Sequence, residues 1–149
     1  MTQITPASPA DIPRLCELLT MLFALEADFA PAPEKQAAGL REIIAHPEAG
    51  RILVLREGDA IIGMANLLFT ISTACGGKVC MLEDVIVRPE QRGDGLGTAL
   101  LEVAIAVAQQ EGCLRITLLT DRANDGAIRF YQRNGFALSE MIPLRKLLD

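Results

Sequence analysis

Three glycines at alternate positions are the residues of this sequence with the clearest chemical meaning, and they lie between a strand-like stretch and a helix-like stretch. Glycine tolerates positive φ angles and lets a ligand approach the main chain closely. The first turn of a helix adds unpaired N–H groups and a positive dipole end, which attract phosphate oxygens. Arg88 and Arg92 are expected to add mobile positive charge beside this loop, so the run predicts a cradle for a diphosphate group. The run is Arg92, Gly93, Asp94, Gly95, Leu96, Gly97 and Thr98.

Two familiar phosphate-binding loops do not fit these residues. A P-loop carries Lys followed by Ser or Thr after its glycines, and residues 92–98 contain no lysine. A dinucleotide-binding loop needs a further glycine at Ala99 or Leu100 and follows the first strand of a βαβ unit. The residues before this loop read as an antiparallel meander instead. Both interpretations therefore fail, and a different diphosphate ligand is expected.

The elements that position the loop follow from the hydrophobic periodicity. Apolar residues at spacings of three and four predict helices, and apolar runs between turn residues predict strands. The resulting order, β-α-α-β-β-β-α-β-α-β, predicts one α/β domain over residues 1–149. Strands are expected at residues 3–5, 51–56, 60–71, 79–87 and 115–120, with one or two more within 136–147. Helices are expected at 9–23, 33–45, 96–111 and from 124 or 125 to 134.

Composition and charge narrow the function. Half of the 149 residues are hydrophobic, and the formal net charge of −5 disfavours nonspecific nucleic-acid binding. No uncharged apolar run approaches the ~20 residues of a membrane-spanning helix, and no basic start precedes an apolar stretch. The four cysteines form no CxxC pair and His46 is the only histidine, so no metal site is expected. Reduced cysteines without a signal peptide predict a cytoplasmic protein.

A second motif lies in the predicted helix that begins near Asn124. It contains Asn124, Ala127, Phe130-Tyr131 and Gly135-Phe136. With this motif and Arg92-x-x-Gly95-x-Gly97 after a strand ending Val-x-Pro, the sequence resembles the GNAT superfamily of acyl-CoA-dependent N-acetyltransferases. The resemblance is close from about residue 79 to 136 and looser before it. It implies a mixed, mainly antiparallel central sheet with helices on both faces and splayed fourth and fifth strands.

The resemblance also assigns roles to residues. The loop at residues 92–98 would bind the diphosphate of acetyl-CoA, the cosubstrate. The backbone of the strand at Val85, Ile86 and Val87 would pair with the pantetheine arm as an added strand does. Asn124 would contact this arm. Tyr131 would lie near the sulfur and protonate the departing thiolate.

The expected reaction also needs a base, because a free alkylamine with a pKa near ~10.4 is mostly protonated at pH 7. Glu83 is the preferred base, acting directly or through water, since the similar Leu/Ile-Glu-Asp segment of small-amine acetyltransferases places its glutamate at the active site. Strand alternation sends Glu83 and Asp84 to opposite faces, which leaves Asp84 a structural role. A backbone N–H near Ile86 is expected to polarise the acetyl carbonyl in a direct transfer without an acyl-enzyme.

The predicted function is therefore N-acetylation of a primary amine on a small molecule. Two alternatives stay open: a noncatalytic acyl-CoA-binding regulatory domain, and an acetyltransferase for protein lysines or N-termini. The family forms its acceptor pocket from the segments found here at residues 26–35 and 72–78. These segments, Asp28 included, carry no motif that identifies the acceptor. Because members commonly dimerise, the resemblance also allows a homodimer.

Overall fold

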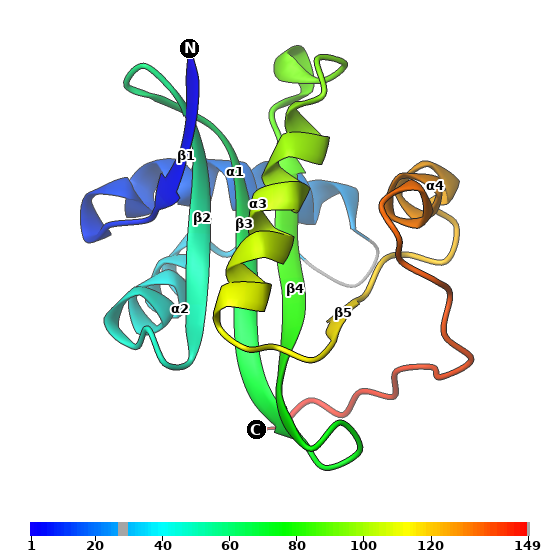
Figure 1. Ribbon diagram of the computed structural model, residues 1–149. Coiled ribbons are helices and arrows are strands. Elements are labelled where there is room, and N and C mark those ends of the chain that lie inside the picture. The colour runs from blue at the N-terminus through cyan, green and yellow to red at the C-terminus, as the bar shows by residue number, and fades with distance from the viewer. Residues whose placement is uncertain (27–29, 149) are drawn as a thin grey trace. The chain divides into compact units, whose positions relative to one another are not determined.

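The computed structural model describes residues 1–26 and 30–148 and divides the chain into two compact units, Met1–Leu119 and Thr120–Asp149. Within the described residues, the first unit is built on a five-stranded sheet (Figure 1). The strands lie side by side in sequence order, antiparallel except for the parallel pair β4–β5. They are β1 (Thr2–Pro6), β2 (Gly50–Glu57), β3 (Ala60–Ser72), β4 (Gly77–Val87) and β5 (Ile116–Leu118).

Helices cover both faces of this sheet. Helices α1 (Ile12–Leu25) and α2 (Pro33–Ala45) pack against one face, and α3 (Leu96–Gln110) packs against the other (Figure 1). Two short 3₁₀ turns, Pro9–Asp11 and Pro89–Gln91, lead into α1 and follow β4. The helices and the three-strand meander thus form where the periodicity predicts them.

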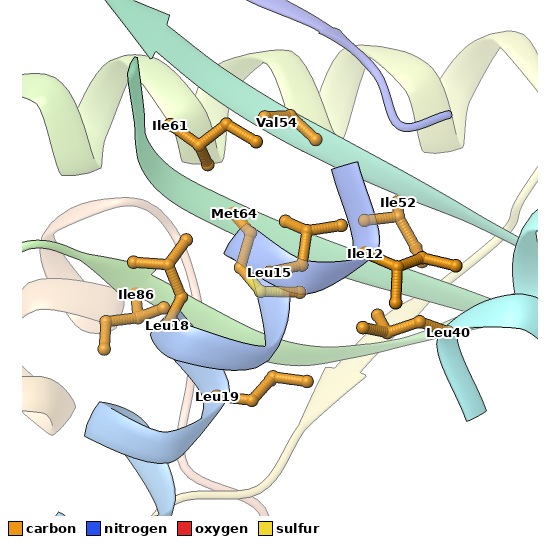
Figure 2. Close-up of a cluster of buried hydrophobic side chains, with 10 residues drawn as sticks. All are labelled: Ile12, Leu15, Leu18, Leu19, Leu40, Ile52, Val54, Ile61, Met64 and Ile86. Carbon is orange, nitrogen blue, oxygen red and sulfur yellow. The ribbon is translucent and has the colours of Figure 1, made fainter. Parts of the chain in front are cut away.

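The central strands β2, β3 and β4 bury residues on both of their faces, because successive residues of a strand point to opposite sides. On β2, Val54 faces α1 and α2, whereas Leu53 and Leu55 lie on the face covered by α3; all three are at most 5% exposed. Figure 2 shows the cluster under α1 and α2, which joins α1, α2 and three strands into one core. The cluster consists of Ile12, Leu15, Leu18, Leu19, Leu40, Ile52, Val54, Ile61, Met64 and Ile86.

The second unit contains helix α4 (Asp125–Arg133), which begins after its cap residue Asn124 as predicted. The prediction of one or two strands within residues 136–147 is wrong, because residues 136–148 contain no strand. A strand forms only where another backbone edge accepts its hydrogen bonds, and an apolar pattern alone does not supply that edge. The single domain over residues 1–149 stays a prediction.

Candidate active site

The glycine loop connects the end of β4 to the start of α3. Gly93 and Gly95 have φ angles of +98° and +76°, a region that favours glycine. A Cβ added at either position would meet no heavy atom within 4 Å, so space is open beside the loop. Gly97 is already helical and lies in the first turn of α3. Two of the three glycines therefore supply the left-handed backbone that the sequence predicts.

The first turn of α3 presents main-chain N–H groups at the end of this loop. No side chain caps the helix, whose N-cap is the left-handed Gly95. The helical ladder begins with the N–H of Ala99, which donates to the carbonyl of Gly95 at 3.0 Å. The amides of Leu96, Gly97 and Thr98 precede this ladder, and they carry the positive end of the helix dipole. The loop can therefore attract phosphate oxygens.

The two arginines near the loop are held differently. Arg92 donates from Nε to the carbonyl of Val87 at 3.0 Å, which keeps its guanidinium between the end of β4 and the loop. Arg88 donates from Nε to the carbonyl of Ile61 at 3.0 Å and pairs with Glu17 on α1 at 3.3 Å. The expectation that Arg88 adds mobile charge beside the loop is therefore wrong, because its guanidinium is fixed toward α1.

Strand β4 extends beyond its partner β5. The two strands pair only from Cys80 to Leu82, whereas β4 continues to Val87. Along Glu83 to Val87 the edge of β4 that is remote from β3 is thus not paired with β5. Val85 on this stretch is half-buried, and Ile86 and Val87 are buried. An extended ligand can add to such an edge through main-chain hydrogen bonds.

A β-bulge interrupts β4 at the start of this stretch. The register changes between the pairs Asn66–Glu83 and Met64–Ile86, so that Ala65 of β3 opposes two residues of β4. One of them, Asp84, has a φ angle of +54° and is the one non-glycine residue with positive φ among those the structure describes. Glu83 itself is exposed.

The bulge overturns the expected separation of Glu83 and Asp84. Directly opposed side chains of an antiparallel pair point to the same face, so Glu83 shares a face with Asn66. The amide of Asn66 donates from Nδ2 to Oδ2 of Asp84 at 3.2 Å, so the Asp84 carboxylate reaches the same side. Burial raises the pKa of Asp84, and this hydrogen bond opposes the rise. Sequence reasoning missed Asn66 altogether, because it reads as one more position in an apolar strand.

The other two predicted residues lie in the second unit. Asn124 caps α4, with Oδ1 accepting from the N–H of Ala127 at 3.0 Å. Tyr131 is half-buried on α4, and its ring makes edge contacts with Phe130 and Phe136. The roles of both residues toward a ligand stay predictions.

A cavity, possible metal-binding groups and possible membrane-spanning helices were considered for residues 1–26 and 30–148. A cavity of about 450 Å³ is lined by Arg14, Glu17 and Arg88, among others, but by none of residues 83–87 or 92–98. No group of three or more His, Cys, Asp or Glu side chains that could hold a metal is found there, nor a helix that could span a membrane. Residues 27–29 lie outside the described residues. They include Asp28, which belongs to the segment expected to form part of the acceptor pocket.

The profile described as the Acetyltransferase (GNAT) family matches residues 14–136. The chain belongs to this family. An integron cassette protein from the mobile metagenome of Cole Harbour Salt Marsh is similar in structure to this GNAT protein. Its TM-score is 0.85 at 27% identity, over 99% of this chain and 91% of that one. The predicted fold class is thereby confirmed.

Curated relatives are similar at modest identity. Glucosamine 6-phosphate N-acetyltransferase of Trypanosoma brucei brucei is 29% identical over 107 residues, which are 71% of this chain and 65% of that protein. Aminoalkylphosphonate N-acetyltransferase of Salmonella typhimurium is 27% identical over 137 residues, which are 92% of this chain and 86% of that protein. The chain thus spans slightly less than two thirds of the trypanosomal protein.

Proposed function

We propose that this GNAT protein transfers the acetyl group of acetyl-CoA directly to a primary amine of a small molecule. The observation that carries the proposal is the juxtaposition in the first unit of two features of the β4–α3 junction. The open loop at Gly93 and Gly95 fits a diphosphate, and the part of β4 next to it that extends past its pairing with β5 fits an extended arm. Acetyl-CoA combines these two shapes in one molecule.

The residues available for binding match the parts of acetyl-CoA. Amides of the loop from Gly93 to Thr98 face the diphosphate in this proposal, with the Arg92 guanidinium beside them. The main chain of Val85 and Ile86 offers hydrogen bonds to the pantetheine arm, whereas the carbonyl of Val87 already accepts from Arg92. The open space at both glycines leaves room for the ligand, so the structure fits the group.

The chemistry requires a neutral amine, a polarised carbonyl and a protonated leaving group. In this proposal Glu83 removes one proton from the ammonium, directly or through water, and the amine then attacks the acetyl carbon. A main-chain N–H near Ile86 stabilises the developing oxyanion. The C–S bond breaks, and Tyr131 donates a proton to the departing thiolate. The attacking nitrogen releases its second proton, through solvent, to the tyrosinate, which restores Tyr131 and leaves the neutral amide.

The relatives support a small acceptor. The two enzymes named above are called after glucosamine 6-phosphate and aminoalkylphosphonates, both small molecules that bear a primary amine. The exposed Glu83 also places a carboxyl group on the face where a cationic acceptor would approach. The acceptor itself is left to experiment.

The direct test measures thiol release from acetyl-CoA with a panel of polyamines, amino sugars, aminoglycosides, amino acids and aminoalkylphosphonates. We expect release that depends on one class of amine. Binding of acetyl-CoA without release for any acceptor would favour the noncatalytic alternative. Lysine-containing peptides are assayed beside this panel, and release only with peptides would favour a protein acetyltransferase.

A matched pair of glycine variants separates cofactor binding from folding. Gly95→Val should raise the KM for acetyl-CoA, because a branched side chain is strained at φ +76° and fills the open space beside the loop. Gly58→Val introduces similar strain at φ +59° in the β2–β3 turn, also with nothing within 4 Å of its Cβ. Gly58→Val should lower the free energy of unfolding while leaving the KM for acetyl-CoA unchanged. Equal KM values for acetyl-CoA in Gly95→Val and Gly58→Val would contradict binding at the loop.

A further inference from the structure

The bulge of β4 contains a buried acceptor without a donor. Asn66 is 3% exposed, and its Oδ1 has no hydrogen-bond partner, whereas its Nδ2 donates to Asp84. Leaving such a buried oxygen unpaired is costly. The atom is closed off from bulk solvent. The first place to look for its donor is therefore a group already next to this amide.

Asp84 is the polar side chain that already contacts this amide. An ionised carboxylate only accepts hydrogen bonds, so it can serve Nδ2 of Asn66 but not Oδ1. A protonated carboxylic acid has an O–H as well as a free carbonyl oxygen, and it can serve both atoms of the amide at once. Protonation of Asp84 would thus supply the donor that Oδ1 of Asn66 lacks.

The charged groups around Asp84 do not hold it ionised. No ion pair joins Asp84 to another residue in the part of the chain that the structure describes. On α1, Arg14 donates to the carbonyl of Asp59, Glu17 pairs with Arg88, and Cys16 is the remaining titratable group.

The other neighbouring elements add little charge. Helix α3 carries only Glu102, which is exposed, and neither β3 nor β5 contains an ionisable residue. On β4 itself, Lys78 lies six residues away, and the adjacent charge is that of Glu83. Burial raises the pKa of Asp84 more than the hydrogen bond from Asn66 lowers it. This shift favours the protonated carboxyl group, as the unpaired Oδ1 of Asn66 also does.

We propose that Asp84 carries a proton in the resting protein and exchanges two hydrogen bonds with Asn66, which closes the bulge of β4. Asn66 donates from Nδ2 to one carboxyl oxygen, and the protonated oxygen of Asp84 donates to Oδ1 of Asn66. The pair holds the left-handed backbone at Asp84 in place. Asp84 is then a positioning residue.

This pair has a consequence for the reaction, and that consequence rests on the proposed function. Two ionised carboxylates at adjacent positions on one face would raise each other's pKa. A neutral Asp84 spares Glu83 this repulsion, so that Glu83 stays ionised and able to accept a proton from the amine at neutral pH.

The substitution Asp84→Asn provides the main test. Asparagine tolerates positive φ, and its amide can donate and accept as the protonated acid does, so the variant should fold like the wild type. In the infrared difference between wild type and D84N at pH 7, we expect the carbonyl stretch of a protonated carboxylic acid. Asn66→Leu should move this band, because it removes both hydrogen bonds, whereas Gln36→Leu, which removes another buried unpaired amide in α2, should leave it unchanged.

Stability against pH gives a second readout. With a raised pKa in the folded state, the protonated form contributes stability below the unfolded-state value of 3.8, and this is lost as pH rises through the folded-state pKa. The unfolding midpoint of wild type should therefore fall relative to that of D84N as pH rises above about 4. The proposal would be overturned if the infrared difference contained no such band and if the difference in unfolding midpoint between wild type and D84N did not change with pH.

Enzyme kinetics then test the consequence for Glu83. If Asp84 is neutral, the acid limb of the pH profile of kcat/KM should lie at the same pH in wild type and D84N. A limb that moves to lower pH in D84N would show that Asp84 was charged and coupled to Glu83, against the proposal. If no acceptor gives thiol release, the proposed function fails, but the infrared and stability measurements still decide the protonation of Asp84.

Discussion

Glu83 is an exposed carboxylate on the strand edge where an amine is expected to react. Glu83→Gln removes its charge but keeps its size. A general base contributes roughly 10²–10⁴-fold, so kcat/KM at pH 7 should fall by about that factor. The loss should shrink as pH rises toward the pKa of the amine, because the free amine then becomes abundant without a base.

The measurement is the pH profile of thiol release for wild type and E83Q with one acceptor. Glu90→Gln, on the exposed 3₁₀ turn after β4, serves as the control and should follow the wild type. A profile of E83Q equal to that of wild type would exclude Glu83 as the base.

Tyr131 allows a substitution that changes only one oxygen. Its ring lies 5.1 Å from that of Phe130 and 5.7 Å from that of Phe136, between ring centroids. Tyr131→Phe keeps these edge contacts of the ring. If the hydroxyl protonates the thiolate, kcat should fall about 10²–10⁴-fold with little change in the KM for acetyl-CoA. An unchanged kcat in steady-state assays would remove Tyr131 from the reaction.

The short turn before α1 is tied to β2 by one ion pair. Asp11 accepts from both terminal nitrogens of Arg56, at 2.9 and 2.6 Å, and from the N–H of Ser8 at 2.8 Å. The hydrogen bond from Arg56 lowers the pKa of Asp11 from 3.8 to about 2, against the effect of burial. This pair joins the N-terminal turn to the sheet that carries the site.

Asp11→Asn should therefore lower the free energy of unfolding at pH 7 by about 2 kcal/mol. Because the folded-state pKa is depressed, this contribution is complete above pH 3.8 and is lost as pH falls through about 2. Denaturant titrations from pH 7 downward should show the difference between wild type and D11N shrinking. Asp59→Asn, in the exposed β2–β3 turn, is the control and should stay within experimental error of wild type.

The sequence predicts elements better than it predicts irregularities within them. The helices and the β2–β3–β4 meander follow from periodicity, and the positive φ at Gly93 and Gly95 follows from residue type. The bulge at Asp84 was missed, because one inserted residue changes which side chains share a face without changing the apolar pattern. Likewise, nothing in the sequence indicates that Arg88 bonds the carbonyl of Ile61 across the sheet.

At the scale of the whole molecule, the two faces of the sheet are filled differently. The core under α1 and α2 and the layer under α3 fix β2, β3 and β4 from both sides. The sheet ends at β5, a strand of three residues that is only half-buried. The sheet thus ends in a short strand beside the edge of β4 that the proposed function uses.

The last apolar residues of the chain bear on the homodimer that the resemblance allows. Leu138 is 73% exposed, Met141 87% and Leu144 91%, within a segment that forms neither helix nor strand. Monomeric proteins rarely expose so many large apolar side chains together. We expect this segment to be covered by a second copy of the chain. Sedimentation should then give a dimer for wild type and a monomer for Leu144→Glu, whereas Ile71→Glu, at a 71% exposed residue of β3, should stay dimeric. A wild-type monomer at all concentrations would contradict this expectation.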